Sequence, residues 1–362
     1  MRRVRTWLLV PTALALLLGC CNGRITVMSY NVGGLFDTSA DGTEYEPPAN
    51  AAEAQEALER RCSAVSGAIR RSIPRGPDVV ALQEIENEGV LRTLRDGWLR
   101  GLGYRWLAAA GGPPSATRVG VLSRLPLAGV RSHLPAPGAT GEEQRAILEV
   151  VLSVGGAPLY LFNNHWKSKI GGLGQTEEAR RRAARSLAGR VGDILARDPL
   201  ADVLVVGDLN EDVTDGLPAG LALGVVGGAD GVIALTADAS ALLSVSGKLR
   251  LYEPWLARGS PPGSYAYGGS WSRPDHLLMS SGLFDERGLR YRGGSFRVAA
   301  LPFLMDDKSG FPRGGGDRGA SGYSDHLPIL VTLERCRPVR SPRRARQGLG
   351  SRRPGTWAPR GT

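Results

Sequence analysis

The sequence is poor in cysteine, histidine and lysine, with four of each among its 362 residues. Four Cys in a chain of this length exclude a small fold held together by disulfides. There is no Cys-x-x-Cys and no His-Glu-x-x-His, so the spacings typical of zinc sites are absent. The phosphate-binding Gly-x-x-x-x-Gly-Lys-Ser/Thr loop and the Gly-x-Ser-x-Gly turn of esterases are absent as well.

Acidic residues are missing from both ends of the chain. Residues 1–19 carry three Arg and residues 335–362 carry nine, so of the formal net charge of +10 residues 20–334 hold −2. A charge of +10 would by itself suggest binding to nucleic acid. Because the excess lies in the two ends, the near-neutral body gives no such indication.

The N-terminus has the pattern of an export signal. A basic start, MRRVR, precedes an apolar run at residues 7–18 that is shorter than the roughly 20 residues needed to span a membrane. The run ends in Leu17-Leu18-Gly19-Cys20, which resembles the lipobox of bacterial lipoproteins. We therefore expect residues 1–19 to be a lipoprotein signal peptide and Cys20 to be lipidated, with an ordinary secretory signal as the alternative. The mature chain would be tethered to a membrane of the cell envelope, on its periplasmic or extracellular face.

The body between the ends reads as one domain. Hydrophobic residues make up 42% of the chain, and no internal repeat or boundary divides residues 24–334. The tail at 335–362 has Pro, Gly and Arg with few apolar residues, and we expect it to be disordered. Cys62 and Cys336 either form a disulfide or are two separate buried thiols.

Short β-branched runs alternate with helical stretches and loops rich in Gly, Pro and Ser. Strands are predicted at 25–32, 79–84, 119–123, 146–154, 159–165, 203–208, 275–280 and 327–333. Helices are predicted at 51–72 and 176–197, with Thr176 as the N-cap of the second. Loops are predicted at 111–118, 134–144, 214–248, 257–274 and 305–324.

Polar side chains gather where the predicted strands begin or end. They are Asn31, Gln83, Glu84, Asn163, Asn164, His165, Asp208, Asn210, Asp275, His276, Asp325 and His326. Three of the four His belong to this set, whereas His133 is predicted to be a solvated residue in a loop. Polar groups are costly to bury against a sheet unless they are paired or bind a ligand. So many of them at strand ends suggest one shared site.

The pattern resembles the endonuclease/exonuclease/phosphatase superfamily, which has the deoxyribonuclease I-like fold. The matching segments are SYNVGGLFD, PDVVALQEIEN, VGVLSRLPL, NNHWKSK, VVGDLNED, SWSRPDHLLMS and GYSDHLPI, in the family's order over residues 25–333. HWKSKIGG and the stretch 265–271 look most like the secreted or lipid-anchored bacterial branch. The resemblance implies an α/β (α+β) fold, a four-layer sandwich of two mixed, mostly antiparallel sheets flanked by helices.

The resemblance also implies a divalent metal site made of hard oxygen ligands, which suit Mg²⁺ or Mn²⁺. Glu84 is implied as the main metal ligand, Asn31 lies beside it, and Asp325 helps to hold the metal through water. Some nucleases of the family have an acid two residues after the Asn, where this sequence has Gly33.

The catalytic roles carried over from the family fall on five residues. Asp208 orients or deprotonates the attacking water, and Asn210 donates to a phosphoryl oxygen. Asp275 orients His326, whose other nitrogen faces the charge that builds on the phosphate. His165 contacts the phosphate or protonates the leaving oxygen.

Two residues after the predicted strand at 159–165 are expected to bind substrate: Lys167 and Ser168. Lys167 is a cation that could meet a phosphate backbone. Strand alternation turns His276 to the face opposite Asp275, so it should lie behind the site at most.

The leading hypothesis is a metal-dependent phosphodiester hydrolase, specifically a nuclease acting on nucleic acid outside the cytoplasm. The alternatives are a phosphoesterase for a lipid headgroup or small phosphate ester, and a surface lipoprotein that kept the fold without catalysis. The lipid anchor implies a membrane partner, no protein partner is indicated, and a monomer is expected.

Overall fold

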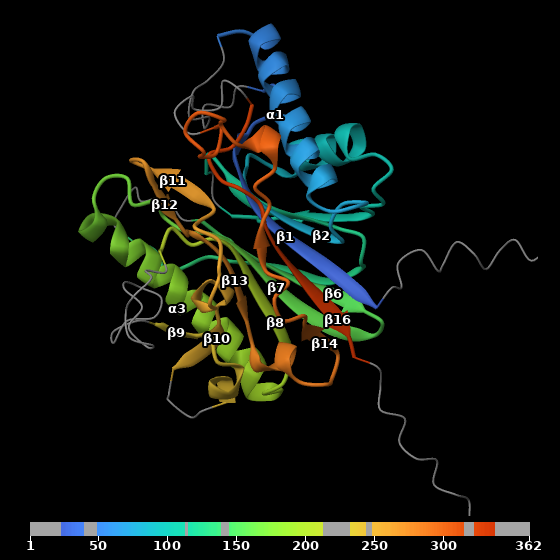
Figure 1. The fold of residues 1–362 in the computed structure, drawn as a ribbon, viewed down its shortest axis with the longest axis vertical. Coiled ribbons are helices and arrows are strands. Elements are labelled where there is room, and N and C mark those ends of the chain that lie inside the picture. Colours follow the sequence, from blue (N-terminus) through green and yellow to red (C-terminus); the bar gives the residue numbers. More distant parts are fainter. Residues whose placement is uncertain are drawn as a thin grey trace, which may run out of the picture.

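The computed structural model describes residues 23–39, 49–112, 115–138, 145–212, 232–243, 248–314 and 322–336. The predicted signal peptide, Cys20 and the tail beyond Cys336 lie outside the described residues. Within them the chain forms two seven-stranded sheets and a separate hairpin (Figure 1). None of the described helices is long and apolar enough to cross a membrane.

The first sheet has β1 near its centre, in the order β14-β16-β1-β2-β4-β3, with β15 paired to β16. Its strands are β1 (Arg24–Leu35), β2 (Val79–Ile85), β3 (Trp106–Ala109), β4 (Arg118–Ser123), β14 (Leu289–Tyr291), β15 (Arg297–Val298) and β16 (Ile329–Arg335). β1 and β2 are parallel, and the other pairs are antiparallel.

The second sheet has the order β5-β6-β7-β8-β13-β10-β9. Its strands are β5 (Leu127–His133), β6 (Ile147–Val154), β7 (Ala157–His165), β8 (Asp202–Asp208), β9 (Ile233–Thr236), β10 (Leu249–Tyr252) and β13 (Asp275–Met279). β7 pairs with β8 and β9 with β10 in parallel, and the remaining pairs are antiparallel. The separate hairpin is β11 (Tyr265–Tyr267) and β12 (Ser270–Ser272).

Helices cover the outer faces of both sheets. α1 (Ala51–Ser72) and α2 (Glu88–Thr93), which continues into a π-helical turn (Leu94–Trp98), pack on the first sheet. α3 (Leu173–Arg197) packs on the second (Figure 1). Single 3₁₀ turns lie at Ala239–Leu243, Pro254–Leu256, Ser281–Phe284 and Pro302–Leu304. The predicted four-layer sandwich of mixed, mostly antiparallel sheets is confirmed.

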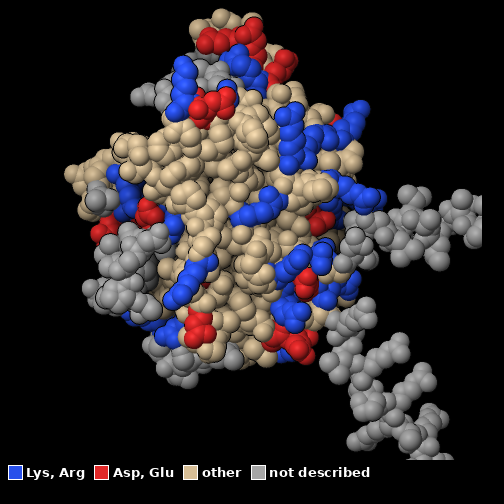
Figure 2. Space-filling model, in the orientation of Figure 1, with Lys and Arg blue, Asp and Glu red and all other residues tan. Residues whose placement is uncertain are grey.

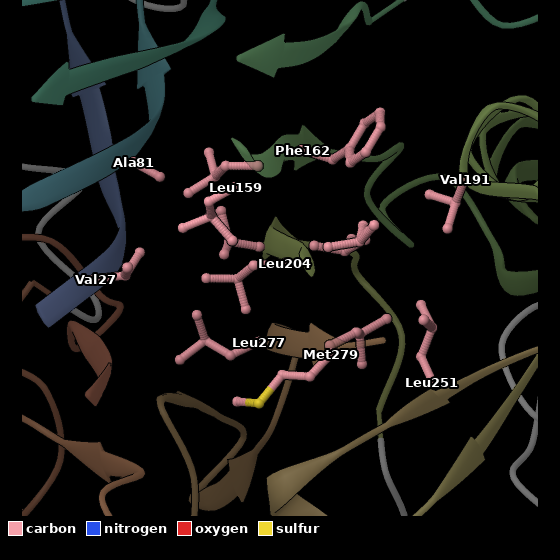
Figure 3. Close-up of a cluster of buried hydrophobic side chains, with 14 of the residues drawn as sticks. Val27, Ala81, Leu159, Phe162, Val191, Leu204, Leu251, Leu277 and Met279 are labelled. Carbon is pink, nitrogen blue, oxygen red and sulfur yellow. The ribbon is translucent and has the colours of Figure 1, made fainter. Parts of the chain in front are cut away.

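Strand alternation divides the core into layers. Leu204 of β8 and Leu277 of β13 point toward Val27 of the first sheet, whereas Phe162 of β7 points toward Val191 of α3 (Figure 3). All five side chains are fully buried. Burying an apolar side chain of this size stabilises the fold by about 1.5–3 kcal/mol, so the layered core fixes which face of each strand meets the other sheet.

Several sequence predictions are corrected by the structure. α3 begins at Leu173 with Gly172 as its N-cap, so Thr176 is not the cap; its hydroxyl donates to the Gly172 carbonyl at 2.9 Å. The predicted loop 257–274 contains the β11–β12 hairpin, and the loop 214–248 contains β9. Glycine at 172 has φ 115°, a backbone conformation that side chains with a Cβ rarely adopt.

The structure also corrects the prediction for His133 and decides between the two alternatives for Cys62 and Cys336. His133 lies in β5, and its Nε2 is 2.6 Å from Oε2 of the buried Glu149, so it is not a solvated loop residue. Cys62 is a free thiol on the buried face of α1, within the core. Cys336 is also free, and its thiol donates to the Asp285 carbonyl. The two form separate thiols rather than a disulfide.

Candidate active site

Strand alternation brings the predicted site residues to one end of the space between the sheets. Asn31 lies on the same face of β1 as Val27, and Asp208 and His165 end β8 and β7 side by side, paired in register. Asp275 begins β13 directly opposite Asp208. In each strand the apolar residues of one face pack between the sheets, and the polar residue at the strand end lies on that same face. Four residues distant in sequence therefore meet at one end of the two sheets.

Glu84 reaches this end through a break in the β2 ladder. Leu82, two residues before it, faces the core under α1, so regular alternation would turn Glu84 the same way. The ladder shifts register between Gln83 and Ile85, and Glu84 has φ 60°. A positive φ is uncommon for a residue with a Cβ, and such strain often occurs at functional positions. The bulge therefore aims the carboxylate into the site.

Asn31 joins two carboxylates. Its Nδ2 donates to Glu84 Oε1 at 3.1 Å and to Asp208 Oδ2 at 3.0 Å. Its Oδ1 accepts from the Gly33 amide at 3.0 Å, in a turn where Gly33 has φ 68°. The amide nitrogen, rather than the oxygen, thus faces the acids. The Asn31 carbonyl accepts from the Ser324 hydroxyl at 2.7 Å, which ties β1 to the segment before β16.

Asp208 is almost fully buried, with 2% of its surface exposed. Its Oδ1 accepts from the Asn210 amide at 2.9 Å, within a turn where Asn210 has φ 50°. Burial raises the pKa of Asp208 to about 6, although the positive charge of His326 opposes this. Asn210 itself donates through Nδ2 to the Trp166 carbonyl at 3.1 Å. A carboxyl with this pKa suits proton transfer near neutral pH.

Asp275 and His326 form a buried pair. Asp275 Oδ2 lies 2.8 Å from His326 Nδ1 and also accepts from the Ser264 hydroxyl at 2.6 Å. Burial alone would lower the pKa of His326, but the Asp275 carboxylate overcomes this and raises it well above its usual value. The Tyr265 ring packs on the imidazole with a centroid distance of 4.6 Å. Nε2 of His326 therefore faces Asp208, 3.8 Å away, with the imidazole held in its charged form.

His165 has the opposite character. Burial and the nearby Arg145 lower its pKa well below the usual value. Arg145 Nη1 lies 2.8 Å from Nε2 and 3.2 Å from Nδ1 of His165, so the guanidinium lies against both ring nitrogens. Nε2 is also 3.6 Å from Glu84 Oε1 and 3.8 Å from Asp208 Oδ2. Burial and the adjacent guanidinium therefore favour the neutral form of His165.

Asp208, Asp275 and His326 each offer one ligand atom within 4.8 Å of the others. Asp275 Oδ1 is buried and has no hydrogen-bond partner among the described residues. The charged His326 cannot ligate a cation, but the carboxylates of Asp208 and Asp275, with Glu84 linked to Asp208 through Asn31, offer hard oxygens that suit Mg²⁺ or Mn²⁺. Asp325 is half-buried next to the pair, and its negative charge helps to raise the pKa of His326.

The two predicted substrate-binding residues follow β7. Lys167 and Ser168 are half-buried. The charge of Lys167 helps to lower the pKa of His165, which places the ammonium near the site. Ser168 Oγ accepts from the Ile170 amide at 3.2 Å, so the hydroxyl also stabilises a turn.

His276 lies behind the site, as strand alternation predicts. Its Nδ1 is 2.6 Å from Glu253 Oε2 and its Nε2 is 3.1 Å from the Glu211 carbonyl. Both side chains of this pair are buried.

Sequence reasoning missed four residues that hold the site: Arg145, Ser264, Tyr265 and Ser324. Arg145 stands directly before a predicted strand, and this position at a strand end was its one available signal. Ser264 and Tyr265 lie in a segment assigned to a loop, where the sequence shows no apolar pattern that would place them against Asp275 and His326.

Comparison with known proteins defines the class. The model of the Endonuclease/Exonuclease/phosphatase family matches residues 26–335. The chain therefore belongs to this family, whose members hydrolyse phosphodiester bonds, and it is a hydrolase acting on phosphate esters. No curated protein matches it closely.

Solved structures share the fold at low identity. The truncated TDP2 of Caenorhabditis elegans is 16% identical over 86% of this chain and 97% of that chain, with a TM-score of 0.50. The sphingomyelinase C of Streptomyces griseocarneus is 18% identical over 85% and 99%, with a TM-score of 0.50. A family protein from Bacteroides thetaiotaomicron is 15% identical over 86% and 94%, with a TM-score of 0.51.

Proposed function

We propose that this chain is a Mg²⁺- or Mn²⁺-dependent nuclease, held at the cell envelope by a lipid on Cys20. Nucleic acid is favoured over a lipid headgroup as the substrate because the site lies far along β1 from the end of the strand next to Cys20. This strand begins at Arg24, four residues after Cys20, and reaches the site seven residues later at Asn31. A strand rises about 3.3 Å per residue, so the site is about 23 Å along β1 from the anchored end.

Both ends of the described chain leave the sandwich away from the site (Figure 1). Arg24 pairs with Glu334 near the end of β16, whereas His326 precedes the beginning of that strand. A lipid headgroup in the anchoring membrane would have to reach the far end of the sandwich. Nucleic acid in solution meets no such obstacle, which favours the nuclease.

A surface groove along α1, which reaches Tyr323 in the segment that leads to His326, supports the same choice. It has a volume of about 410 Å³ and lies between α1 and the aromatic side chains of Phe303 and Tyr323. Arg60 and Arg71 of α1 line it together with one acid. Cations and aromatic rings are the groups that hold the phosphates and bases of a single strand. On the face shown in Figure 2, Lys and Arg lie among Asp and Glu, so the charge there is mixed.

A second candidate is a phosphoesterase for lipid headgroups. Two large apolar side chains are strongly exposed next to site segments: Ile170, 84% exposed, after β7, and Tyr267, 78% exposed, in the β11–β12 hairpin. Exposed apolar residues near Lys167 and Lys169 suit a lipid surface. This candidate requires the site end, rather than the anchored end, to face a membrane.

The side chains divide the chemistry between them. Asp208 accepts the proton of the attacking water, and the charged His326 stabilises the negative phosphoryl oxygens. Glu84 would hold the divalent ion, with Asp325 acting through water, while Asn31 donates through Nδ2 to the Glu84 carboxylate and so orients it instead of ligating the ion itself. When bound, the ion supplies Lewis-acid stabilisation of phosphate charge.

The test compares the purified chain with its Asp208→Ala variant on plasmid DNA, RNA and sphingomyelin vesicles. Each substrate is incubated with Mg²⁺, Mn²⁺ or a chelator. We expect metal-dependent cleavage of nucleic acid that falls by about 100-fold or more in the variant. Intact DNA and RNA under all conditions would refute the nuclease, and cleavage of sphingomyelin alone would establish the second candidate.

A further inference from the structure

A buried arginine of α3 joins two segments of the site from behind. Arg180 is 2% exposed and Glu211 is 6% exposed. Nε of Arg180 donates to Glu211 Oε1, in the turn that follows β8. Its Nη1 donates to the Lys167 carbonyl at 3.2 Å, in the segment that follows β7, and to the Thr176 hydroxyl at 2.8 Å. One guanidinium therefore spans the two segments.

The turn after β8 is held on its other side by a second buried group. The Glu211 carbonyl lies 3.1 Å from Nε2 of His276, which pairs through Nδ1 with the fully buried Glu253. His276 follows Asp275 in β13. The backbone at Glu211 is thus fixed by its side chain to α3 and by its carbonyl to β13.

These two segments carry the residues that perform the proposed chemistry. His165 and Lys167 lie in the first, and Asp208 and Asn210 lie in the second. They contact each other through Trp166, whose amide donates to the Asp208 carbonyl at 2.9 Å and whose carbonyl accepts from Asn210 Nδ2. Asn210 has a positive φ, and strained backbone persists only where its surroundings hold it.

We propose that Arg180, through Glu211, is a positioning residue that sets the distance between the β7 and β8 segments of the site. The proposal rests on the phosphodiesterase activity proposed above. Stability alone does not account for the pair, because two apolar side chains of similar volume often replace a buried ion pair without loss. An apolar side chain cannot, however, donate to the Lys167 carbonyl. A displacement of about 1 Å in a site can cost about 100-fold in rate.

The same helix provides a matched control. Arg190 of α3 donates to both carboxylate oxygens of Glu149 in β6, at 2.8 and 2.7 Å, and Glu149 also pairs with His133. Burial opposes ionisation of Glu149, yet these partners lower its pKa to about 2. In this second ion pair Glu149 is buried and Arg190 is half-buried. The pair bonds to neither site segment, so its removal tests stability without touching the site.

The experiment uses the full chain with Arg180→Met, Glu211→Met and the double variant, beside the double variant Arg190→Met/Glu149→Met. Unfolding free energy is measured with denaturant, and kcat and KM are measured on bis(4-nitrophenyl) phosphate with Mg²⁺. We expect each single variant to lose stability, because its partner charge stays buried alone, and the double variant to regain most of it. Although its stability is regained, Arg180→Met/Glu211→Met should still have a kcat about tenfold or more below that of the wild type, with KM within about twofold. The control Arg190→Met/Glu149→Met should keep the wild-type kcat.

A readout independent of activity accompanies this test. Amide hydrogen exchange in peptides covering 163–169 and 206–212 should speed up about tenfold in the Arg180→Met/Glu211→Met variant and stay unchanged in the control. A double variant with wild-type kcat and wild-type exchange would overturn the positioning role. A wild-type chain without diesterase activity, or with activity that survives Asp208→Ala, would instead refute the proposed function, while the exchange data would still decide on Arg180.

Discussion

β8 begins and ends in a buried aspartate, and the two ends of this one strand behave differently. Asp202, 7% exposed, lies at the end of the sandwich from which the described chain leaves, and its Oδ2 accepts from the Leu289 amide at 2.9 Å. Asp208 lies at the site end, where donors and imidazoles surround it. Burial raises the pKa of both carboxyls, that of Asp202 to about 7 and that of Asp208 to about 6.

The neighbours decide what each buried carboxyl can do. Near Asp202 the acids Asp285 and Asp198 raise the pKa further, while the Leu289 amide and Arg287 lower it. Near Asp208 the charged His326 favours the ionised form. Burial favours the neutral form of both carboxyls, and each has a cation that opposes it, Arg287 for Asp202 and the imidazolium of His326 for Asp208. Only Asp208 lies among the site residues, so substitutions at the two ends of β8 should separate activity from stability.

The largest effect is expected for Asp208→Asn. The amide fills the same space and keeps an acceptor, but it cannot take a proton from water. We expect kcat to fall by about 10²- to 10⁴-fold, the range for losing a general base. Steady-state kinetics on bis(4-nitrophenyl) phosphate with Mg²⁺ measure this.

The matched control is Asp202→Asn at the other end of the strand, which should turn over at the wild-type rate. Equal loss of kcat in both variants would mean that the β8 fold, rather than the site, was damaged. Wild-type kcat in Asp208→Asn would contradict the assigned base.

A smaller loss is expected for His326→Gln. Glutamine retains a donor for Asp275 Oδ2, so the buried carboxylate keeps its partner, but the positive charge facing Asp208 is lost. Removing such charge stabilisation lowers kcat by about 10²- to 10³-fold. Kinetics in the same assay measure the loss, with His133→Gln as the control, because the imidazole of His133 pairs with Glu149 in the second sheet. The comparison fails if His133→Gln loses as much activity as His326→Gln.

The sequence predicts the site end better than the rest of the fold, for a physical reason. Strand periodicity places Asn31, Asp208 and Asp275 correctly, because each follows or precedes a long apolar run with a defined buried face. The bounds of α1 at 51–72 also agree with the prediction. β5 was missed because it is an edge strand whose residues are mostly exposed, so no apolar alternation marks it.

The buried arginine of α3 is predictable from helical periodicity, and only its partners required the structure. Arg180, Arg181 and Arg182 are consecutive, and successive residues of a helix point about 100° apart. Arg180 stands seven residues before Leu187, so it falls on the buried face that Leu187 and Val191 define. Glu84 was predicted in the site through the family resemblance alone, because strand alternation assigns it to the other face and only the bulge reverses this.

The smallest effect concerns the pH dependence of stability at the Asp202 end. The folded-state pKa of about 7 lies above the unfolded value of about 3.9, so the folded chain binds the extra proton between these pH values. Stability from this group is therefore fully present below about pH 4 and is lost as pH rises to about 7. The difference amounts to about 1–3 kcal/mol, because one pKa unit corresponds to about 1.4 kcal/mol and part of it is relieved by local opening.

Denaturant unfolding of wild type and Asp202→Asn at a series of pH values measures this difference. The variant should be the more stable chain at pH 8, and its stability should change less with pH. The exposed Asp193→Asn is the control and should keep the wild-type slope. Parallel profiles for wild type and Asp202→Asn would show that Asp202 ionises normally, and the contrast between the two ends of β8 would then rest on the site alone.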